Sequence, residues 1–212
     1  MKGEETAFDR ITQDRRRAQH TYNYLSRKYD WLSISEAGFK TRAVRMLDIK
    51  PAEKVLEIGC GTGHLLLKLA SRAGTLGRVV GIDLSSGMIE TARQRLEKSG
   101  AWPKVKLHLG DAASLPYSKG YFDAVLMTFV LELFDPSEIP IVLGECRRVL
   151  KPEGRMGVAS LSLPDQQNLM TRTYNWFHRR FPEWVDCRPI PLMACLAEAG
   201  FYILDSWNGS MW

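Results

Sequence analysis

The chain has 212 residues, of which 45% are hydrophobic and 25% charged, with a formal net charge of +5. This composition is that of an ordinary globular protein, and the length is enough for one sizeable domain with a hydrophobic core. No apolar run approaches the roughly 18 residues that a membrane-spanning helix needs, and the first residues lack the apolar stretch of a signal peptide. We therefore expect a cytoplasmic protein with no transmembrane segment.

The four cysteines, Cys60, Cys146, Cys187 and Cys195, are widely scattered and form no C-x-x-C pair. This spacing indicates neither a zinc site nor a redox motif, so we expect reduced, mostly buried thiols and no metal. The positive charge is concentrated in residues 1–50. The three arginines at 15–17 could contact phosphates or an anionic membrane surface, although a solvated face is the more common role of such a run.

The first fifty residues are typical of one or two helices, including a periodic one around Ala43–Leu47, and form an N-terminal helical cap. In residues 51–160 short apolar runs alternate with helical periodicity, and Ser85 or Ser86 is placed to cap the second core helix. The four residues 151–154 predict a turn before the last core strand. The predicted strands are Val55–Ile58, Arg78–Ile82, Val105–Leu109, Phe122–Met127 and Arg155–Ser160, and the intervening helices cover 65–70, 87–98 and 139–150.

Continuously apolar strands alternating with amphipathic helices favour a parallel sheet covered on both faces. The expected fold is therefore α/β, a doubly wound, mostly parallel sheet of the Rossmann-like kind. In such folds the ligand sites lie at the carboxyl ends of the strands. Residues 51–160 form this core.

After residue 160 the alternation of strands and helices ends. Residues 161–190 hold Tyr174, Trp176, Phe177, Phe181 and Trp184 and predict a helical insertion. A last helix at 191–199 and a last strand at 201–207 follow, so residues 191–212 form a C-terminal helix and edge strand. Because the chain has no repeat or low-complexity linker, we expect residues 1–212 to be a single domain.

A glycine-rich segment stands between the first core strand and its helix. Glycines at 59, 61 and 63 allow unusual backbone angles and let a ligand approach the main chain, and the free amides that begin a helix can receive an anionic group. A dinucleotide fingerprint would need a glycine at position 64, where the chain has His64. Asp83 ends the second strand, where a carboxylate would reach the two hydroxyls of a ribose. The pattern indicates a nucleoside cofactor and disfavours NAD.

At this point the sequence resembles the class I S-adenosyl-L-methionine-dependent methyltransferases, in particular the group related to the ubiquinone and menaquinone biosynthesis C-methyltransferases. The resemblance covers about residues 22–160. It rests on four ordered motifs, VLEIGCGTGH, VVGIDLSSGMIETARQRL, LGDAASLPYSKGYFDAVLMTFVLELF and RVLKPEGRM. It implies S-adenosyl-L-methionine as cofactor and S-adenosyl-L-homocysteine as product.

The resemblance also implies roles for individual residues. Glu57 would lie near the methionine amino group, Asp83 would bind the ribose hydroxyls, and Asp111 would meet the adenine. Asp111 could instead cap its own turn, and Met88 could be core. The predicted cofactor-binding residues are Glu57, Gly59, Cys60, Gly61, Thr62, Gly63, Asp83, Leu84, Met88, Asp111, Ala112, Thr128 and Phe129.

Methyl transfer from a sulfonium needs chiefly an acceptor held in line and the exclusion of water. A base is required only if the acceptor must lose a proton. Catalytic residues therefore cannot be found from spacing, although His178 is a conceivable base. Aromatic residues outside the core could line a pocket for a flat or lipid-like small-molecule acceptor, and the candidates are Tyr22, Tyr24, Tyr29, Trp31, Trp176 and Phe177.

Alternatives stay open at this level. Methylation of RNA or protein would be favoured if the N-terminal arginines formed a basic surface beside the cofactor, although nucleic acid is not the expected partner. A cofactor-binding module without turnover is a further alternative. Asn208-Gly209 is a hairpin signal followed by only three residues, so the family's usual seventh strand is missing. We expect an incompletely paired C-terminal edge strand, through which the protein could form a homo-oligomer.

Overall fold

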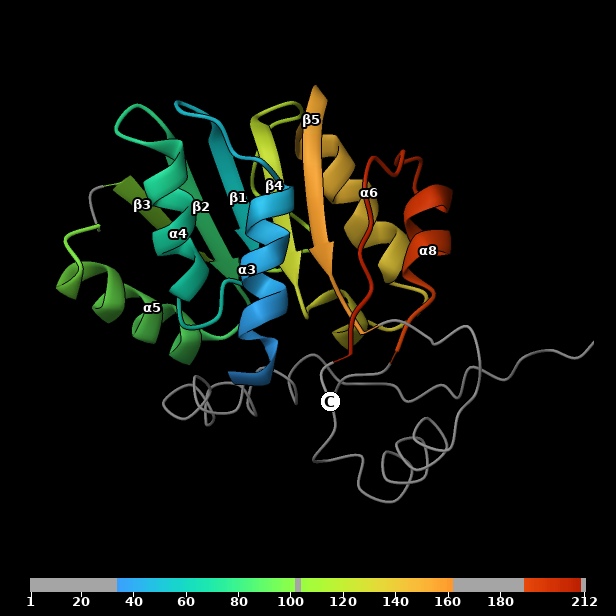
Figure 1. The fold of residues 1–212 in the computed structure, drawn as a ribbon, viewed down its shortest axis with the longest axis horizontal. Coiled ribbons are helices and arrows are strands. Elements are labelled where there is room, and N and C mark those ends of the chain that lie inside the picture. Colours follow the sequence, from blue (N-terminus) through green and yellow to red (C-terminus); the bar gives the residue numbers. More distant parts are fainter. Residues whose placement is uncertain (1–33, 102–103, 162–188, 211–212) are drawn as a thin grey trace, which may run out of the picture.

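The computed structural model describes residues 34–101, 104–161 and 189–210. Within these residues the chain forms a five-stranded sheet in the order β3-β2-β1-β4-β5 (Figure 1), and every neighbouring pair of strands is parallel. The strands are β1 (Lys54–Ile58), β2 (Arg78–Asp83), β3 (Val105–Leu109), β4 (Phe122–Thr128) and β5 (Leu150–Ala159). The predicted doubly wound α/β fold is confirmed.

Helices cover both faces of this sheet. The helices are α3 (Ala37–Met46), α4 (His64–Ala73), α5 (Ser86–Lys98), α6 (Ile139–Val149) and α8 (Leu192–Glu198), with short 3-10 helices η1 (Ile34–Glu36) and η3 (Leu131–Leu133). The side chains of α3, α4 and α5 share one hydrophobic cluster with Val55, whereas α6 and α8 share a second cluster with Leu56. Successive residues of a strand point to opposite faces, so each buried strand contributes to both cores.

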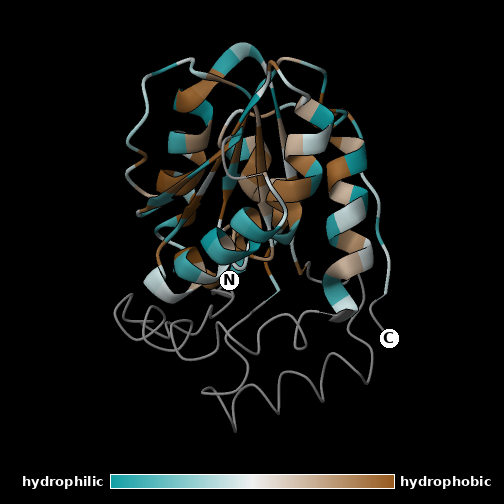
Figure 2. Ribbon diagram, turned by 90° about the vertical axis from the view of Figure 1, so that its left-hand side faces the viewer, coloured by the Kyte–Doolittle hydropathy of each residue, from teal (hydrophilic) through white to brown (hydrophobic). Residues whose placement is uncertain are grey.

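Hydrophobic residues follow this layered arrangement. Figure 2 shows brown, apolar positions on the strands and on the helix faces turned toward them, with teal positions turned outward. The two central strands are the most deeply buried, because Val55, Leu56, Ala124, Val125 and Leu126 are all fully inaccessible. Such runs are typical of a parallel sheet that is covered on both sides. Among the described residues no helix is long and apolar enough to cross a membrane.

The strand register brings the ends of the strands together. Ile58, the last residue of β1, lies opposite Ile82 on one side and Met127 on the other. The next residues along the three strands are therefore Gly59, Asp83 and Thr128, at one edge of the sheet. All five strands end at this edge, the lower one in Figure 1.

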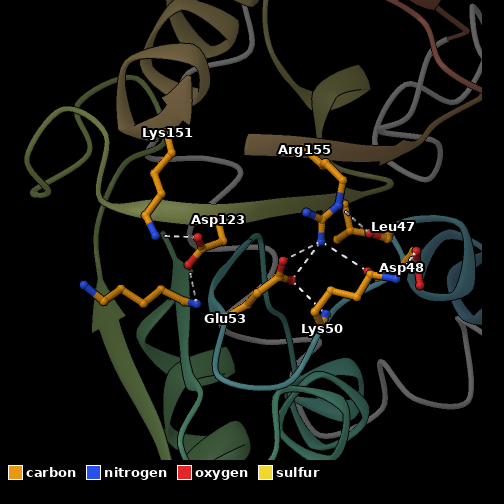
Figure 3. A network of polar contacts seen from close by, with 8 residues as sticks. Leu47, Asp48, Lys50, Glu53, Asp123, Lys151 and Arg155 are labelled. Carbon is orange, nitrogen blue, oxygen red and sulfur yellow. Dashed lines mark hydrogen bonds and ion pairs between the residues drawn. The ribbon is translucent and has the colours of Figure 1, made fainter. Parts of the chain in front are cut away.

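A network of charged residues fixes the opposite, amino end of the sheet (Figure 3). Asp123 accepts a hydrogen bond from the backbone N–H of Lys54 at 2.9 Å and is paired with Lys151. Arg155 Nη2 reaches both carboxylate oxygens of Glu53, at 2.8 and 2.9 Å, and Arg155 Nε donates to the backbone oxygen of Leu47 at 3.1 Å. These contacts tie α3, β1 and β5 together, and they place Asp123 away from the carboxyl edge.

One prediction about the last strands holds in part and one is wrong. The turn predicted at 151–154 lies inside β5, which begins at Leu150. Phe122 pairs with Leu150 and Ala124 with Arg155, so residues 151–154 form an irregularity in which a Cβ on Gly154 would lie 2.9 Å from the Lys151 backbone oxygen. The strand predicted at 201–207 does not form in the described residues. In an extended segment Tyr202 and Leu204 would share one side and are 94% and 86% exposed, and Ile203 on the other side is 41% exposed, so neither side is buried as a strand face would be.

Side-chain contacts hold this C-terminal segment instead. The Trp207 ring lies 5.3 Å from the Phe39 ring of α3, and the Arg42 guanidinium lies 4.3 Å from the centroid of the Trp207 ring. The segment lines a groove of about 1400 Å³ together with one edge of β5. Residues 201–210 thus run beside the sheet without joining its hydrogen-bonded ladder, and the hairpin signal at Asn208-Gly209 forms no hairpin in the described residues.

Candidate functional site

The glycine-rich segment makes a left-handed turn between β1 and α4. Gly59, Gly61 and Gly63 have φ angles of +66°, +51° and +81°, a region that residues with a side chain rarely adopt. The backbone N–H groups of Gly59 and Cys60 donate to the carbonyl of Ile82, at 2.8 and 3.1 Å. A Cβ on Gly59 would lie 2.2 Å from Val130 Cγ2. Both its backbone angle and its close packing therefore require glycine at position 59.

Asp83 joins this turn to the next helix. Its Oδ2 accepts a hydrogen bond from the Gly61 N–H at 2.9 Å, and its Oδ1 accepts one from the Ser85 N–H at 2.9 Å. Burial raises the pKa of the Asp83 carboxyl, and these backbone hydrogen bonds oppose that rise. The Leu84 N–H is a third backbone donor to this carboxyl. A carboxylate has about four acceptor positions, so three backbone donors still leave capacity for a hydroxyl group of a ligand.

Glu57 lies within the sheet just before the turn. It is 2% exposed, and its Oε2 has no hydrogen-bond partner among the described residues. Burial raises the pKa of this carboxyl well above its usual value; Lys40 opposes the rise and Asp83 adds to it. Buried carboxylates are normally paired, so an oxygen without a partner at a strand end indicates a place for a ligand cation or donor.

Two residues of the turn direct their side chains toward protein neighbours. Arg95 Nη1 donates to the backbone oxygen of Thr62 at 2.6 Å and to its hydroxyl at 2.9 Å, which links the turn to α5. Cys60 is 4% exposed, and its Sγ lies where a side chain on Gly81 would be. Burial raises the pKa of the Cys60 thiol well above its usual value, so it is suited to packing.

The start of α5 and the end of β3 border the same edge. Ser85 is the residue that caps α5, because its hydroxyl accepts a hydrogen bond from the Met88 N–H at 3.1 Å. Met88 is 2% exposed and belongs to the packed interior, whereas Leu84 is partly buried. Asp111 accepts a hydrogen bond from the Ala113 N–H at 2.9 Å, so it caps its own turn. Ala112 beside it is buried.

The residues after β4 form the floor of this edge. Thr128 and Phe129 are both 6% exposed. Phe129 has a φ angle of +56°, which is strained for a side chain of this size, and its N–H donates to the Ala159 carbonyl at 2.7 Å. The Phe129 ring meets Phe39 edge to face at 6.4 Å, with Lys40 Nζ 5.8 Å from its centroid.

Two charged residues near this floor were not predicted. Glu132 is 1% exposed, and burial raises its pKa to about 7. The only sequence signal for it is an acid within the apolar run TFVLELF. Lys40 reaches the edge from α3, and its position depends on how that helix packs across the sheet.

All thirteen residues predicted to bind the cofactor lie in the described part of the chain. The structure brings Glu57, the glycine turn, Asp83, Thr128 and Phe129 to one edge of the sheet. His64, the first residue of α4, is exposed. The described residues contain no group of three metal-binding side chains. The three N-terminal arginines, Cys187, His178 and the candidate aromatic pocket residues Tyr22, Tyr24, Tyr29, Trp31, Trp176 and Phe177 lie outside the described residues.

Comparison with known proteins defines the class. Residues 55–154 match the family described as "Methyltransferase domain". The chain is 33% identical over 187 residues to a 2-phytyl-1,4-naphtoquinone methyltransferase of Trichormus variabilis, covering 87% of this chain and 72% of that protein. It is 36% identical to a demethylmenaquinone methyltransferase of Symbiobacterium thermophilum, covering 68% of this chain and 58% of that protein.

A solved structure agrees on the fold. A SAM-dependent methyltransferase from Aquifex aeolicus superimposes with a TM-score of 0.64 at 22% identity, covering 84% of this chain and 87% of that one. The chain belongs to the methyltransferase domain family. More particularly, it is a class I S-adenosyl-L-methionine-dependent methyltransferase related to the quinone methyltransferases.

Proposed function

We propose that this chain binds S-adenosyl-L-methionine at the carboxyl edge of β1, β2 and β4 and transfers its methyl group to a small aromatic or lipid-like acceptor. The observation that supports the site best is the Glu57 Oε2 atom, a buried carboxyl oxygen beside the glycine turn that has no partner in the part of the chain that the structure describes. The methionine part of the cofactor carries an ammonium group, which would pair with this oxygen. Asp83 would then receive the ribose hydroxyls.

The remaining predicted residues fit this placement. The positive-φ turn at Gly59, Gly61 and Gly63 brings backbone close to a ligand. Leu84, Met88, Asp111 and Ala112 would border the adenine, and Thr128 and Phe129 would lie beneath the sulfonium. Because Thr62 and Cys60 face protein neighbours, we propose that these two contribute through their backbone only.

Glu57→Gln tests the proposed ammonium contact. The variant keeps the shape of the side chain but removes its charge, so affinity for S-adenosyl-L-homocysteine should fall by at least about tenfold. The ligand-free variant should be as stable as the wild type or more stable at neutral pH, because burial disfavours the ionised carboxyl. Glu198→Gln, an exposed change on α8, is the matched control. Unchanged affinity in Glu57→Gln would argue against this placement.

The acceptor class is supported by the named relatives, which act on a naphthoquinone and on demethylmenaquinone. We propose a reduced, hydroxyl-bearing quinone or a similar phenol as acceptor. The assay is methyl transfer from radiolabelled cofactor to 1,4-naphthoquinol and its 2-prenyl derivatives, followed by mass analysis of the product. Transfer of the labelled methyl group to RNA or protein, without methylation of the quinols, would favour the alternative of a macromolecular acceptor. Cofactor binding without turnover on any acceptor would favour a binding module.

We also propose that the protein acts in the cytoplasm, that its 212 residues form one domain, and that it associates with a second copy through the C-terminal segment. The last proposal is supported by Tyr202 and Leu204, which are strongly exposed beside an edge strand. Light scattering of the wild type and of a Tyr202→Ser, Leu204→Ser variant would test it. An unchanged molar mass equal to one chain would contradict association.

A further inference from the structure

Glu132 is a buried carboxyl group that has no role in the proposed binding of the cofactor. It lies on η3, three residues after Phe129, at the proposed methyl-transfer floor. Its side chain is 1% exposed, although it carries a titratable group. Burying a carboxyl is costly, so a specific set of contacts must hold it in place.

Those contacts come from the end of β5. Ser160 Oγ donates to Glu132 Oε2 at 3.0 Å, and the Leu161 N–H donates to Glu132 Oε1 at 3.1 Å. The neighbouring residue Ala159 accepts the hydrogen bond from the Phe129 N–H at 2.7 Å. Ser160 therefore follows directly after Ala159, the residue that holds the Phe129 backbone, and the Ser160 hydroxyl is bonded to the Glu132 carboxyl.

Ser160 also faces open space. Both Ser160 and Phe129 line the groove of about 1400 Å³ beside β5, whereas Glu132 does not. A molecule in the groove next to Phe129 can thus reach the Ser160 hydroxyl but not the carboxyl behind it. A hydroxyl that bonds a buried carboxyl on one side and opens to a groove on the other can pass a proton between them.

We propose that Glu132, acting through the Ser160 hydroxyl, receives the proton that a hydroxyl-bearing acceptor loses during methyl transfer. This inference rests on the proposed function. The acceptor O–H proton moves to Ser160 Oγ while the Ser160 proton moves to Glu132. A ring carbon of the resulting oxyanion forms a bond to the methyl carbon, and the methyl–sulfur bond breaks with its electron pair remaining on sulfur. The ring C–H proton leaves to water, and the acceptor oxygen regains its proton from Glu132 through Ser160.

The surroundings of Glu132 suit this role. Burial raises its pKa to about 7, the Leu161 and Ser160 hydrogen bonds oppose the rise, and Glu36 of η1 adds to it. Glu36 is paired with Lys40 of α3 at 2.7 Å. A base with a pKa near the working pH is both available in its ionised form and strong enough to take the proton.

The experiment compares the wild type with Glu132→Gln, Ser160→Ala and Ser160→Thr on a quinol acceptor. We expect the kcat of Glu132→Gln to fall about 100-fold or more, with wild-type affinity for S-adenosyl-L-homocysteine. The wild-type kcat should rise with pH through about 7. The kcat of Glu132→Gln should not show this rise with pH. Ser160→Thr should keep most of the rate that Ser160→Ala loses. Glu198→Gln serves as control.

The outcomes separate the two proposals. A wild type that neither binds the sulfur nucleoside nor methylates quinols overturns the proposed function, and this inference with it. If the wild type methylates quinols and Glu132→Gln keeps the same kcat and the same dependence of kcat on pH, the role of Glu132 is overturned while the proposed function stands. Parallel loss of kcat and nucleoside affinity in Glu132→Gln also overturns it, because a structural role would do that. If Glu132→Gln fails to fold, equal activity of Ser160→Ala and Ser160→Thr overturns the relay.

Discussion

The Oδ2 atom of Asp83 accepts a hydrogen bond from the Gly61 N–H at 2.9 Å, which joins the end of β2 to the glycine turn that follows β1. The second oxygen of the same carboxylate binds the Ser85 N–H at the start of α5. One side chain therefore fixes two loops at the proposed cofactor site. It shapes the turn as well as presenting acceptor oxygens to a ribose.

Asp83→Asn should separate these roles from general folding. The amide can accept only through one oxygen, so one backbone donor loses its acceptor and the turn loosens. Affinity for S-adenosyl-L-homocysteine should drop at least about tenfold, a loss of about 1.4 kcal/mol. Isothermal titration measures it, with the exposed Asp205→Asn as control. Equal affinities of Asp83→Asn and the wild type would refute the assignment.

Gly59→Ala should damage the protein more than an ordinary glycine substitution. The new Cβ would lie 2.2 Å from Val130 Cγ2, at a φ angle of +66°. Strain and overpacking together predict a loss of about 2–4 kcal/mol in the free energy of unfolding. Gly38→Ala is the matched control, because a Cβ at Gly38 meets nothing within 4 Å and the residue lies in α3. Urea unfolding of both variants should show a loss only at position 59.

Glu132 predicts a pH-dependent stability that can be measured without any substrate. Its pKa is raised to about 7 in the folded protein, so its stabilising contribution is complete below its ordinary value of 4.5 and is lost as pH rises to about 7. Glu132→Gln removes this titration. It should therefore exceed the wild type in stability at pH 8 by up to about 3 kcal/mol, and the difference should shrink toward pH 5. A difference that is constant between pH 5 and pH 8 would show that Glu132 does not titrate there.

Arg155→Lys probes the opposite end of the sheet. Arg155 contacts Glu53 through both carboxylate oxygens and also reaches the Leu47 carbonyl, a fork that lysine cannot reproduce. Stability should fall by about 1–2 kcal/mol, while affinity for the nucleoside stays unchanged because the network lies away from the carboxyl edge. Chemical denaturation and titration check the two halves of this prediction. Arg78→Lys, at the exposed first residue of β2, should change neither quantity.

Local sequence patterns were enough to predict the core of the fold. The five strands and the α4, α5 and α6 helices follow from apolar runs and helical spacing, and the glycine turn and Asp83 follow from their positions at strand ends. Ser85 as the cap of α5 was one of two predicted candidates. These features depend on residues that are close together in the sequence, so local patterns are enough to predict them.

Features set by distant contacts were missed. Glu132 is buried with its carboxyl oxygens bonded to Ser160 and Leu161, which come nearly thirty residues later in the chain. The apolar segment 201–207 has the composition of a strand, but side-chain contacts of Trp207 with α3 hold it instead of a ladder. The last core strand was predicted to begin at Arg155, but β5 already begins at Leu150, because Leu150 pairs with Phe122 ahead of the irregularity at 151–154. Such partners cannot be recognised from local patterns.

The most direct test of the central claim is isothermal titration of the wild-type protein with S-adenosyl-L-methionine, S-adenosyl-L-homocysteine and NAD. The proposed site predicts binding of both sulfur nucleosides at one site per chain, weakened by Asp83→Asn and by Glu57→Gln, and no binding of NAD. Well-folded protein that binds neither sulfur nucleoside, or binds them equally well without the Glu57 and Asp83 carboxylates, would contradict the proposed site.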